Sequence, residues 1–435
     1  MRDNHNPKSI CKYCNKKVIR INQHLKKCKT YILIKSKDKR HLKQKNYKRF
    51  LKQNTNNKIW FINNNVVKDE ITNNSIKIPK TNFIYFKNFE LGKGTYGNVY
   101  YGLNTKTKQE VAVKLYSEKS DEIKIDYECC LCKDFETLSL SPKIYYFSFV
   151  DKVCVQSLLG PNLETLYNFC KRKFCIKTIS YIGIELINAI EDLHNIGFIH
   201  RDIKPKNIVW LNFSDYQSIV KDNLILIDFG LAGPYVSKDN SHLPFIEKYG
   251  LIGTQYYSSV NSTRGNSQSR RDDIEAIFNC LVYFFKGKLP WEPPQNLKQY
   301  NNSKDNNISF FNKDKIIKKS YKDEIKRILK IKETIEPSIF CKDMPNEYKV
   351  IYCYIKNLLY DERPDYNIIR LLLRNVIESK EKAVKDIDSN KFVWEKKIKD
   401  ILASKKKDES KIKRINNLFH GYPLNIKNLM NMLIK

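Results

Sequence analysis

A polar stretch from His200 to Asn207, with the sequence His-Arg-Asp-Ile-Lys-Pro-Lys-Asn, constrains this chain more than any other feature. Further along, an Asp-Phe-Gly triplet begins at Asp228. Residues 178–193, before the stretch, carry apolar side chains at helical spacing, and an aliphatic run over 224–227 ends at the triplet. Two carboxylates and one carboxamide are therefore expected on loops that leave rigid elements.

This order and spacing indicate phosphoryl transfer, because protein kinases use the same three groups. In those enzymes the first aspartate accepts the proton of the acceptor hydroxyl, and the asparagine and second aspartate bind magnesium. The pattern predicts Asp202 as the base and Asn207 and Asp228 as ligands of Mg2+ or Mn2+. Lys204 is predicted to stabilise the transferred phosphoryl group, and Thr254 to contact the base and the lysine. A lysine at that position favours serine and threonine acceptors over tyrosine.

A glycine-rich segment predicts the nucleotide site. Residues 91–99 are Leu-Gly-Lys-Gly-Thr-Tyr-Gly-Asn-Val, and the next alternating strand contains Val-Ala-Val-Lys. A glycine triplet alone also suits a hairpin turn, but here the strands match those that cover the ATP phosphates in kinases. The residues that these strands contribute are Leu91, Gly92, Gly94, Gly97, Val99, Ala112 and Lys114.

The lysine at 114 needs a helix-borne carboxylate to position it against the phosphates. Glu128 is the predicted partner, and Asp121, Glu122 and Asp126 are rivals on the same segment. The alternative is that Glu128 is an exposed helix charge, because surface charges at helical spacing are common.

Several further segments resemble one family. The chain has Ser-Ser-Val-Asn at 258–261 and Arg-Arg-Asp-Asp-Ile-Glu at 270–275, without the Ala-Pro-Glu that most kinases have there. Together with Ser-Leu-Leu-Gly-Pro-Asn-Leu-Glu at 157–164, Leu-Pro-Trp at 289–291 and Arg-Pro-Asp-Tyr at 363–366, these residues resemble the casein kinase I family over about residues 86–378. The resemblance implies an α+β, bilobal fold: a small antiparallel β-sheet lobe with one helix, and a larger, mainly helical lobe. It also implies an ATP-dependent serine/threonine protein kinase that acts on protein substrates.

The resemblance assigns roles to single residues. Gln156 would be the gatekeeper, and the backbone of Ser157 and Leu159 would hold adenine. Glu128 falls at the position of the helix glutamate of the family, and Asp273 at the aspartate that braces the catalytic loop. His200 would be structural.

The chain also departs from that family. Members that prefer acidic or phosphorylated substrates commonly carry an arginine where this chain has Tyr256, so such a preference is not expected. Longer segments after the catalytic asparagine and after Leu-Pro-Trp leave the related vaccinia-related kinase branch open. An alternative function is a weak or inactive kinase that serves as a scaffold, although no catalytic residue is lost.

A compact Cys/His cluster over residues 8–30 predicts a structural zinc finger. Its expected ligands are Cys11, Cys14, His24 and Cys28, because a paired knuckle and two residues one helical turn apart can close a tetrahedral Zn2+ site. The cluster resembles the ubiquitin-binding fingers of DNA-repair proteins, but Lys26 stands where those usually have an acidic residue. Ubiquitin binding, nucleic-acid binding and a purely structural role stay open.

The rest of the chain separates by composition. Residues 31–82 are predicted to be a basic Lys/Asn-rich linker, 83–378 the kinase domain, and 379–435 a basic, helical tail. The formal charge of +32 favours nucleic acid or other anionic partners, or reflects composition alone. Without a signal-like or membrane-spanning segment, the expected location is intracellular and soluble, cytoplasmic or nuclear, and secretion is not expected.

Overall fold

The computed structural model describes residues 9–10, 17–18, 75–94, 97–117, 127–132, 135, 141–210, 224–293, 310–383 and 392–403. The chain divides into two units, Met1–Asn63 and Asn64–Lys435. In the first unit, β1 (Ser9–Ile10) and β2 (Lys17–Val18) form an antiparallel pair. The four predicted zinc ligands lie outside the described residues, as does the greater part of the predicted linker.

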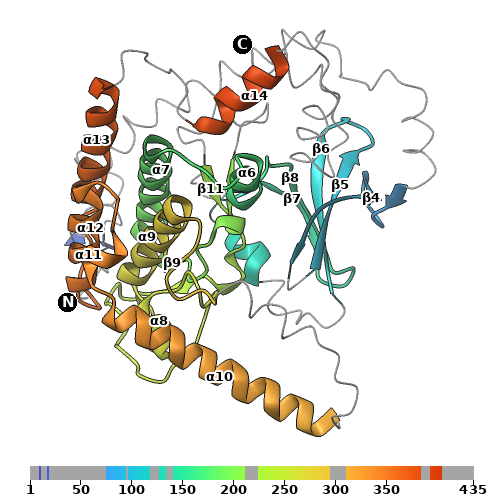
Figure 1. Ribbon diagram of the computed structural model, residues 1–435. Helices are drawn as coiled ribbons and strands as arrows, with labels where there is room; N and C mark the ends of the chain where they lie inside the picture. The colour runs from blue at the N-terminus through green and yellow to red at the C-terminus, as the bar shows by residue number, and fades with distance from the viewer. Residues whose placement is uncertain are drawn as a thin grey trace, which may run out of the picture. The chain divides into compact units, whose positions relative to one another are not determined.

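The second unit begins with a six-stranded antiparallel sheet in the order β3-β4-β5-β6-β8-β7 (Figure 1). Its strands are β3 (Ser75–Lys77), β4 (Phe83–Gly94), β5 (Gly97–Asn104), β6 (Glu110–Tyr116), β7 (Ile144–Ser148) and β8 (Val153–Ser157). Branched residues of β6 and β8, among them Val111, Val113 and Val155, are fully buried on one face of this sheet.

The sheet starts earlier in the chain than residue 83. Strand β3 pairs with β4, and Ile76 lies opposite Tyr85. Ile78 is buried and Ile76 packs beside it in the cluster on the sheet. Apolar residues at every second position give this short segment a buried face, so residues 75–77 belong to the sheet although their composition resembles that of a linker.

A short helix over residues 127–132 connects the sheet to the rest of the core. Cys129, Leu131 and Cys132 are buried, and Phe135 follows them with an exposed fraction of 1%. The ring of Phe135 contacts the ring of Phe229 edge to face at 5.0 Å. This helix therefore packs on both the sheet and the helical part of the unit.

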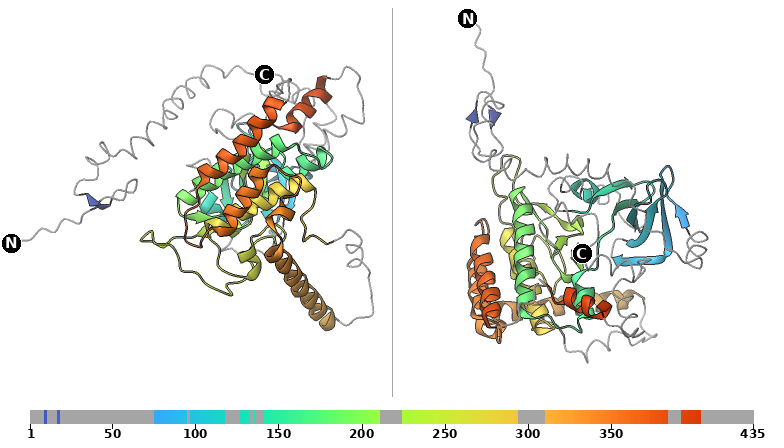
Figure 2. Two further views of the ribbon diagram at one scale, coloured as in Figure 1. Left: turned by 60° about the vertical axis from the view of Figure 1, so that its left-hand side comes forward. Right: turned by 90° about the horizontal axis from the view of Figure 1, so that it is seen from above.

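The remainder of the second unit is mainly helical (Figures 1 and 2). Its long helices are α6 (Leu163–Phe169), α7 (Ile176–Asn195), α9 (Arg270–Lys286), α10 (Phe310–Thr334), α12 (Asn346–Asn357) and α13 (Tyr366–Ala383). The short helices are η1 (Pro205–Asn207), η2 (Phe229–Leu231), α8 (Val260–Arg264) and α11 (Pro337–Phe340). Helix α9 is buried over most of its circumference and forms the centre of this lobe.

Two short strand pairs lie at the boundary of the lobes. Strand β9 (Phe198–Ile199) pairs with β12 (Gly233–Pro234), and β10 (Ile208–Trp210) pairs with β11 (Leu224–Leu226). They hold the loops that follow β9 and β11. The predicted α+β architecture of a small sheet lobe and a larger helical lobe is confirmed.

The expected helix in the C-terminal tail is present as α14 (Val393–Ala403), which lies against α6 and α7 (Figure 1). Trp394 is completely buried and contacts the rings of Phe174 at 5.2 Å and Trp210 at 6.1 Å. The Nζ of Lys397 donates to the carbonyl of Phe169, which is the last residue of α6. The tail helix is thus part of the folded unit.

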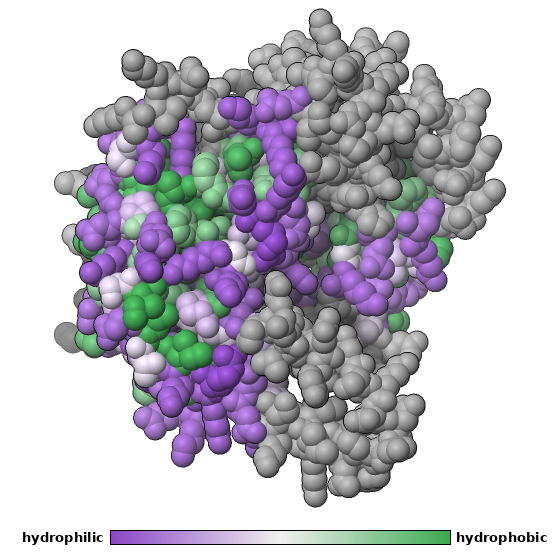
Figure 3. All heavy atoms as spheres, in the orientation of Figure 1, coloured by the Kyte–Doolittle hydropathy of each residue, from purple (hydrophilic) through white to green (hydrophobic). Residues whose placement is uncertain are grey.

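The surface of the helical lobe is mixed. Figure 3 shows hydrophilic residues over most of the described part of this face, with hydrophobic residues exposed in groups. Val350 of α12 and Ile368 and Leu371 of α13 are among the exposed apolar residues. Within the described ranges, no helix is both long and apolar enough to span a bilayer.

Candidate active site

A lysine and a glutamate form an ion pair between the sheet and the short helix. The Nζ of Lys114 in β6 lies 2.7 Å from Oε1 and 2.9 Å from Oε2 of Glu128. Burial opposes the charge on Lys114, but Glu128 and Asp228 outweigh it and raise the pKa of the ammonium. Tyr116 donates to Glu128 at 3.3 Å and places its ring against the ammonium. The three rivals of Glu128 lie outside the described residues.

The glycine-rich segment forms the turn between β4 and β5. Gly92 lies opposite Val99, and Gly94 opposite Gly97, while Val99 pairs with Lys114 across β5 and β6. Gly97 has a φ of +153°, and a Cβ there would lie 2.0 Å from the carbonyl oxygen of Leu115. Only glycine allows β5 and β6 to approach this closely at this point, two residues before Val99 pairs with Lys114.

Apolar residues from the sheet and from the loops gather where adenine is predicted to bind. Leu159, Val209 and Ile225 make up a separate buried cluster, and Ile227 packs against it. On the sheet side, Ala112 is buried and pairs with Gln156. Leu91 and Val99 are both partly buried near the glycine turn.

The chain after β8 supplies backbone groups beside these apolar residues. The N–H of Ser157 donates to the carbonyl of Lys143 at 2.8 Å, so this N–H is already engaged within the sheet lobe. Two residues after Ser157, the backbone of Leu159 borders the apolar cluster. This arrangement agrees with the predicted adenine contacts, which stay predictions.

The catalytic loop brings the predicted base and its partners together. The Nζ of Lys204 donates to Oδ2 of Asp202 at 2.6 Å and to Oγ1 of Thr254 at 3.1 Å. The backbone N–H and the hydroxyl of Thr254 donate to Oδ1 of Asp202 at 2.9 and 2.7 Å. The Nδ2 of Asn207 donates to the backbone carbonyl and to Oδ2 of the same aspartate. Both oxygens of a buried carboxylate are therefore oriented by donors.

Close backbone approach makes this arrangement possible. Gly253 has a φ of +95°, and a Cβ at this position would lie 2.3 Å from the carbonyl oxygen of Arg201. A side chain there would push the segment that carries Thr254 away from the catalytic loop. Glycine at 253 is therefore a condition for the contacts between Thr254 and Asp202.

Asp273 in α9 supports the catalytic loop from below. Its Oδ2 accepts from the backbone N–H of His200 at 2.7 Å, and its Oδ1 from that of Arg201 at 2.9 Å. The ring of His194 contacts the same carboxylate at 3.1 Å. Burial opposes the charge on Asp273, but these hydrogen bonds hold its pKa below the ordinary range. The geometry is that of a brace for the loop, and the side chain does not face the reacting groups.

Two non-glycine residues of the site adopt left-handed backbone conformations. Arg201 and Asp228 each have a φ of 68°. Such a conformation costs about 1–3 kcal/mol and persists only where surrounding contacts enforce it. Asp273 supplies one such contact to Arg201, and Phe229, buried against Phe135, anchors the residue after Asp228.

The residues predicted to bind Mg2+ have suitable chemistry. Asp228 contributes a carboxylate close enough to Lys114 to raise its pKa. Because Nδ2 of Asn207 donates to Asp202, the amide oxygen of Asn207 is the atom that would bind a cation. Magnesium takes oxygen ligands and commonly uses one or two protein groups together with phosphates. Asn207 and Asp228 would hold the ion, which would neutralise phosphate charge.

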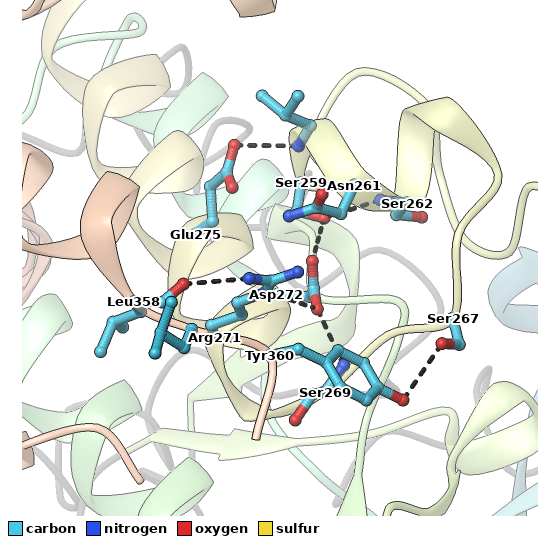
Figure 4. A network of polar contacts seen from close by, with 12 residues as sticks. Ser259, Asn261, Ser262, Ser267, Ser269, Arg271, Asp272, Glu275, Leu358 and Tyr360 are labelled. Carbon is cyan, nitrogen blue, oxygen red and sulfur yellow. Dashed lines mark hydrogen bonds and ion pairs between the residues drawn. The ribbon is translucent and has the colours of Figure 1, made fainter. Parts of the chain in front are cut away.

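A polar network ties helix α8 to the start of α9 (Figure 4). Ser259 caps α8 and donates to Oδ1 of Asp272 at 2.5 Å, while Oδ2 accepts from the N–H of Ser269 at 2.8 Å. Glu275 accepts from the N–H of Val260 at 3.0 Å. Burial raises the pKa of Asp272 to about 6. These contacts anchor the segment in a chain that lacks Ala-Pro-Glu.

Sequence reasoning missed three residues that support the loop after Thr254. Lys332, Asn279 and Trp291 donate to backbone carbonyls of residues 255–258. For Lys332 a signal existed: it lies four residues after the buried Ile328 and three before Ile335, on the apolar face of its helix. A lysine at such a position needs buried acceptors.

The cysteines at 129, 130 and 132 are free thiols, of which Cys129 and Cys132 are buried. Within the described part of the chain, no group of three His, Cys, Asp or Glu residues is arranged to hold a metal ion. Cys129 and Cys132 pack in the core, whereas Cys130 is exposed.

A sheet lobe above a helical lobe, with a lysine–glutamate pair and a braced aspartate between them, defines a phosphoryl-transfer enzyme of the protein kinase class. Residues 85–353 match the protein kinase domain family. The match covers more than half of the chain, which therefore belongs to the protein kinase family. Membership implies the use of ATP and Mg2+ and action on protein substrates.

Proposed function

We propose that this chain is a serine/threonine protein kinase similar to the casein kinase I family. The observation that carries the proposal is the contact of Lys204 with both Asp202 and Thr254, at 2.6 and 3.1 Å. A lysine placed here lies beside the base and can neutralise charge on the phosphoryl group as it moves. The anchoring of α8 by Ser259 and Asp272 supports the resemblance to that family, because both residues belong to the segments that carry it.

In the proposed reaction, the oxygen of a serine or threonine hydroxyl attacks the γ-phosphorus of ATP. The bond between that phosphorus and the β–γ bridging oxygen breaks, and ADP leaves with the bonding electrons. The hydroxyl proton passes to the carboxylate of Asp202. Thr254 and Asn207 keep this carboxylate in place throughout.

The sheet lobe holds the nucleotide. Lys114, fixed by Glu128, would contact the α and β phosphates, and the backbone of Gly92, Gly94 and Gly97 would cover them. Adenine lies between Ala112 and the cluster around Leu159, with Gln156 as the gatekeeper. In this arrangement none of the residues that bind ATP has to contact the protein acceptor.

The test uses three peptides that are identical except for Ser, Thr or Tyr as the acceptor. Wild-type protein should phosphorylate the Ser and Thr peptides, and Asp202→Asn should lose at least about 100-fold in kcat because the base is removed. Asp323→Asn, at an exposed position of α10, is the matched control and should retain full activity. Equal activity of wild type and Asp202→Asn would refute the proposal. ATP binding without turnover would favour the scaffold function, and transfer to tyrosine alone would remove the serine/threonine assignment.

The N-terminal unit is proposed to hold one structural zinc ion. The pairing of Ser9 with Val18 and of Ile10 with Lys17 supports this, because Cys11 and Cys14 fall between the paired strands in the sequence. Metal analysis of the full chain should give about one zinc, the content of a single closed four-ligand site. Cys11→Ser with Cys14→Ser should abolish it, and an unchanged zinc content would refute the assignment.

Partners of the finger are proposals as well. Nucleic-acid binding should weaken steeply with salt and when Lys26 and Lys27 are neutralised, because phosphate contacts release counterions. Ubiquitin binding would not depend on salt in this way. The intracellular location stays a prediction from the sequence.

A further inference from the structure

A completely buried lysine binds the loop that follows Thr254. The exposed fraction of Lys332 is 1%, and its Nζ donates to the carbonyls of Gln255 at 2.8 Å and Ser258 at 2.7 Å. A third contact, at 3.1 Å, is to the hydroxyl of Thr263 in α8. One ammonium therefore joins both ends of a tight turn to the next helix.

The two carbonyls between these ends also have side-chain donors. The indole N–H of Trp291 donates to the carbonyl of Tyr256 at 2.7 Å. The amide of Asn279 donates to the carbonyls of Tyr257 and Ser258 at 3.0 and 3.2 Å. Four consecutive backbone carbonyls, those of residues 255–258, thus accept from side chains of distant elements. We call these three donors, Lys332, Trp291 and Asn279, the carbonyl clamp.

The lysine of the clamp occupies a costly position. Burying an ammonium is unfavourable unless acceptors replace its water. Among the described residues, no carboxylate lies within ion-pair distance of its Nζ, and the face of Trp291 lies 5.0 Å away. Burial lowers the pKa of Lys332 to about 7, with Glu275 of α9 acting in the opposite direction and Lys356 of α12 in the same one. The carbonyl oxygens of Gln255 and Ser258 replace the water molecules that the ammonium loses on burial.

The clamped turn is continuous with the catalytic base. The carbonyl of Thr254 accepts from the N–H groups of Tyr257 and Ser258, each at 3.0 Å, which closes the turn on itself. The other groups of Thr254 donate to Asp202. A shift of the turn would therefore move the residue that borders the base on the acceptor side, while the pair of Lys114 and Glu128 belongs to the other lobe.

We propose that Lys332 is a positioning residue for the protein acceptor. Resting on the proposed kinase function, the inference is that its contacts fix the backbone of residues 254–258, against which the acceptor chain is placed. It does not touch the reacting atoms. If Lys332 only stabilised the fold, its loss would lower stability without affecting the peptide more than ATP. The test is therefore whether kcat/KM for the peptide falls while the KM for ATP stays unchanged.

The experiment compares Lys332→Met with Lys330→Met in the full-length protein. Methionine keeps an unbranched side chain but removes the donors, and Lys330 is an exposed lysine of the same helix. For Lys332→Met we expect kcat/KM for a serine peptide to fall about tenfold or more, as for a buried carbonyl that loses a charged donor. The KM for ATP should stay within about twofold of wild type, because the hydrogen bonds of Lys332 go to residues 255, 258 and 263 and to none of the predicted nucleotide-binding residues. Lys330→Met should match wild type for both substrates.

Two results would overturn the inference. One is a Lys332→Met protein whose kcat/KM for the peptide equals that of Lys330→Met. The other is a rise in the KM for ATP by the same factor as the fall in kcat/KM for the peptide. If Lys332→Met does not fold, Trp291→Phe, which removes a single N–H from the carbonyl of Tyr256, must give the same separation, and unchanged peptide kinetics would overturn it. Absence of transfer by the wild-type protein would instead refute the proposed function.

Discussion

Replacement of Trp394 by alanine should strongly destabilise the kinase domain, although this residue lies beyond the matched family region. Its side chain is completely buried in the structure, stacked on Phe392 with ring centres 4.5 Å apart and an interplanar angle of 8°. It also contacts Phe174 and Trp210. Alanine would leave a cavity lined by three aromatic rings, which are too rigid to fill it.

The expected magnitude follows from that burial. Tryptophan-to-alanine changes in cores cost about 3–5 kcal/mol, and each kcal/mol lowers the melting temperature of a domain of this kind by roughly 2–4 °C. A fall of roughly 6–20 °C is therefore expected. Trp394→Phe should cost less, because it keeps an aromatic ring and removes an indole N–H that is buried without an acceptor among the described residues.

The assay is thermal unfolding followed by circular dichroism, with Leu371→Ala as the control. Leu371 is 56% exposed on α13 and should change the melting temperature by no more than about 2 °C. A second effect is expected on the nucleotide: the backbone of Trp210 bonds to Gly160 and Pro161 beside the adenine site, so the KM for ATP should rise. Equal melting temperatures for Trp394→Ala and Leu371→Ala would refute the view that α14 belongs to the folded kinase unit.

Three further predictions concern the site. Glu128→Gln should lower kcat/KM for ATP by about tenfold or more, measured by steady-state kinetics, whereas the exposed Glu378→Gln should not. Ser259→Ala should lower the free energy of unfolding by about 1–3 kcal/mol, measured with urea, because Asp272 loses a buried donor; an unchanged midpoint would contradict this. The pKa of Lys332 falls from 10.5 to about 7 on folding, so the folded chain binds this proton less tightly. Relative to Lys332→Met, wild-type stability should therefore rise from pH 7 towards 10, with no such gain below 7; parallel pH profiles would argue against this.

The candidate catalytic residues could be located in the sequence because phosphoryl transfer demands particular residue types at short spacings. Asp202, Lys204 and Asn207 lie within one loop, and Asp228 follows a strand that the sequence makes visible. To bring them together, the chain only has to place β11, the strand that precedes Asp228, beside β10, the strand that follows the loop. The two-lobed fold follows from the same motifs, since each lobe contributes half of them.

Other features depend on contacts between distant parts of the chain. The helical spacing of Lys332 from Ile328 and Ile335 indicates that it is buried, but its partners are backbone carbonyls, which every sequence possesses and which no local pattern identifies. Trp394 stands among lysines in a tail whose charge suggests solvent, and its burial depends on a surface formed by Phe174 and Trp210. Strand β3 is too short for its alternation to outweigh the polar residues around it. In each case the position of the residue or strand depends on tertiary packing, which the local sequence pattern does not reveal.

The carbonyl clamp has a consequence for how this enzyme can change. Because the turn is held by its backbone oxygens, the hydrogen bonds of the clamp do not use the side chains of residues 255–257, although the rings of Tyr256 and Tyr257 pack against the core. A substitution of Tyr256, which is only partly buried, would alter the surface offered to an acceptor while these hydrogen bonds remain. In the casein kinase I family, which this chain is proposed to resemble, an arginine is common at the position of Tyr256. Acceptor preference can thus diverge by single substitutions, in nature or in the laboratory, without rebuilding the loop that presents it.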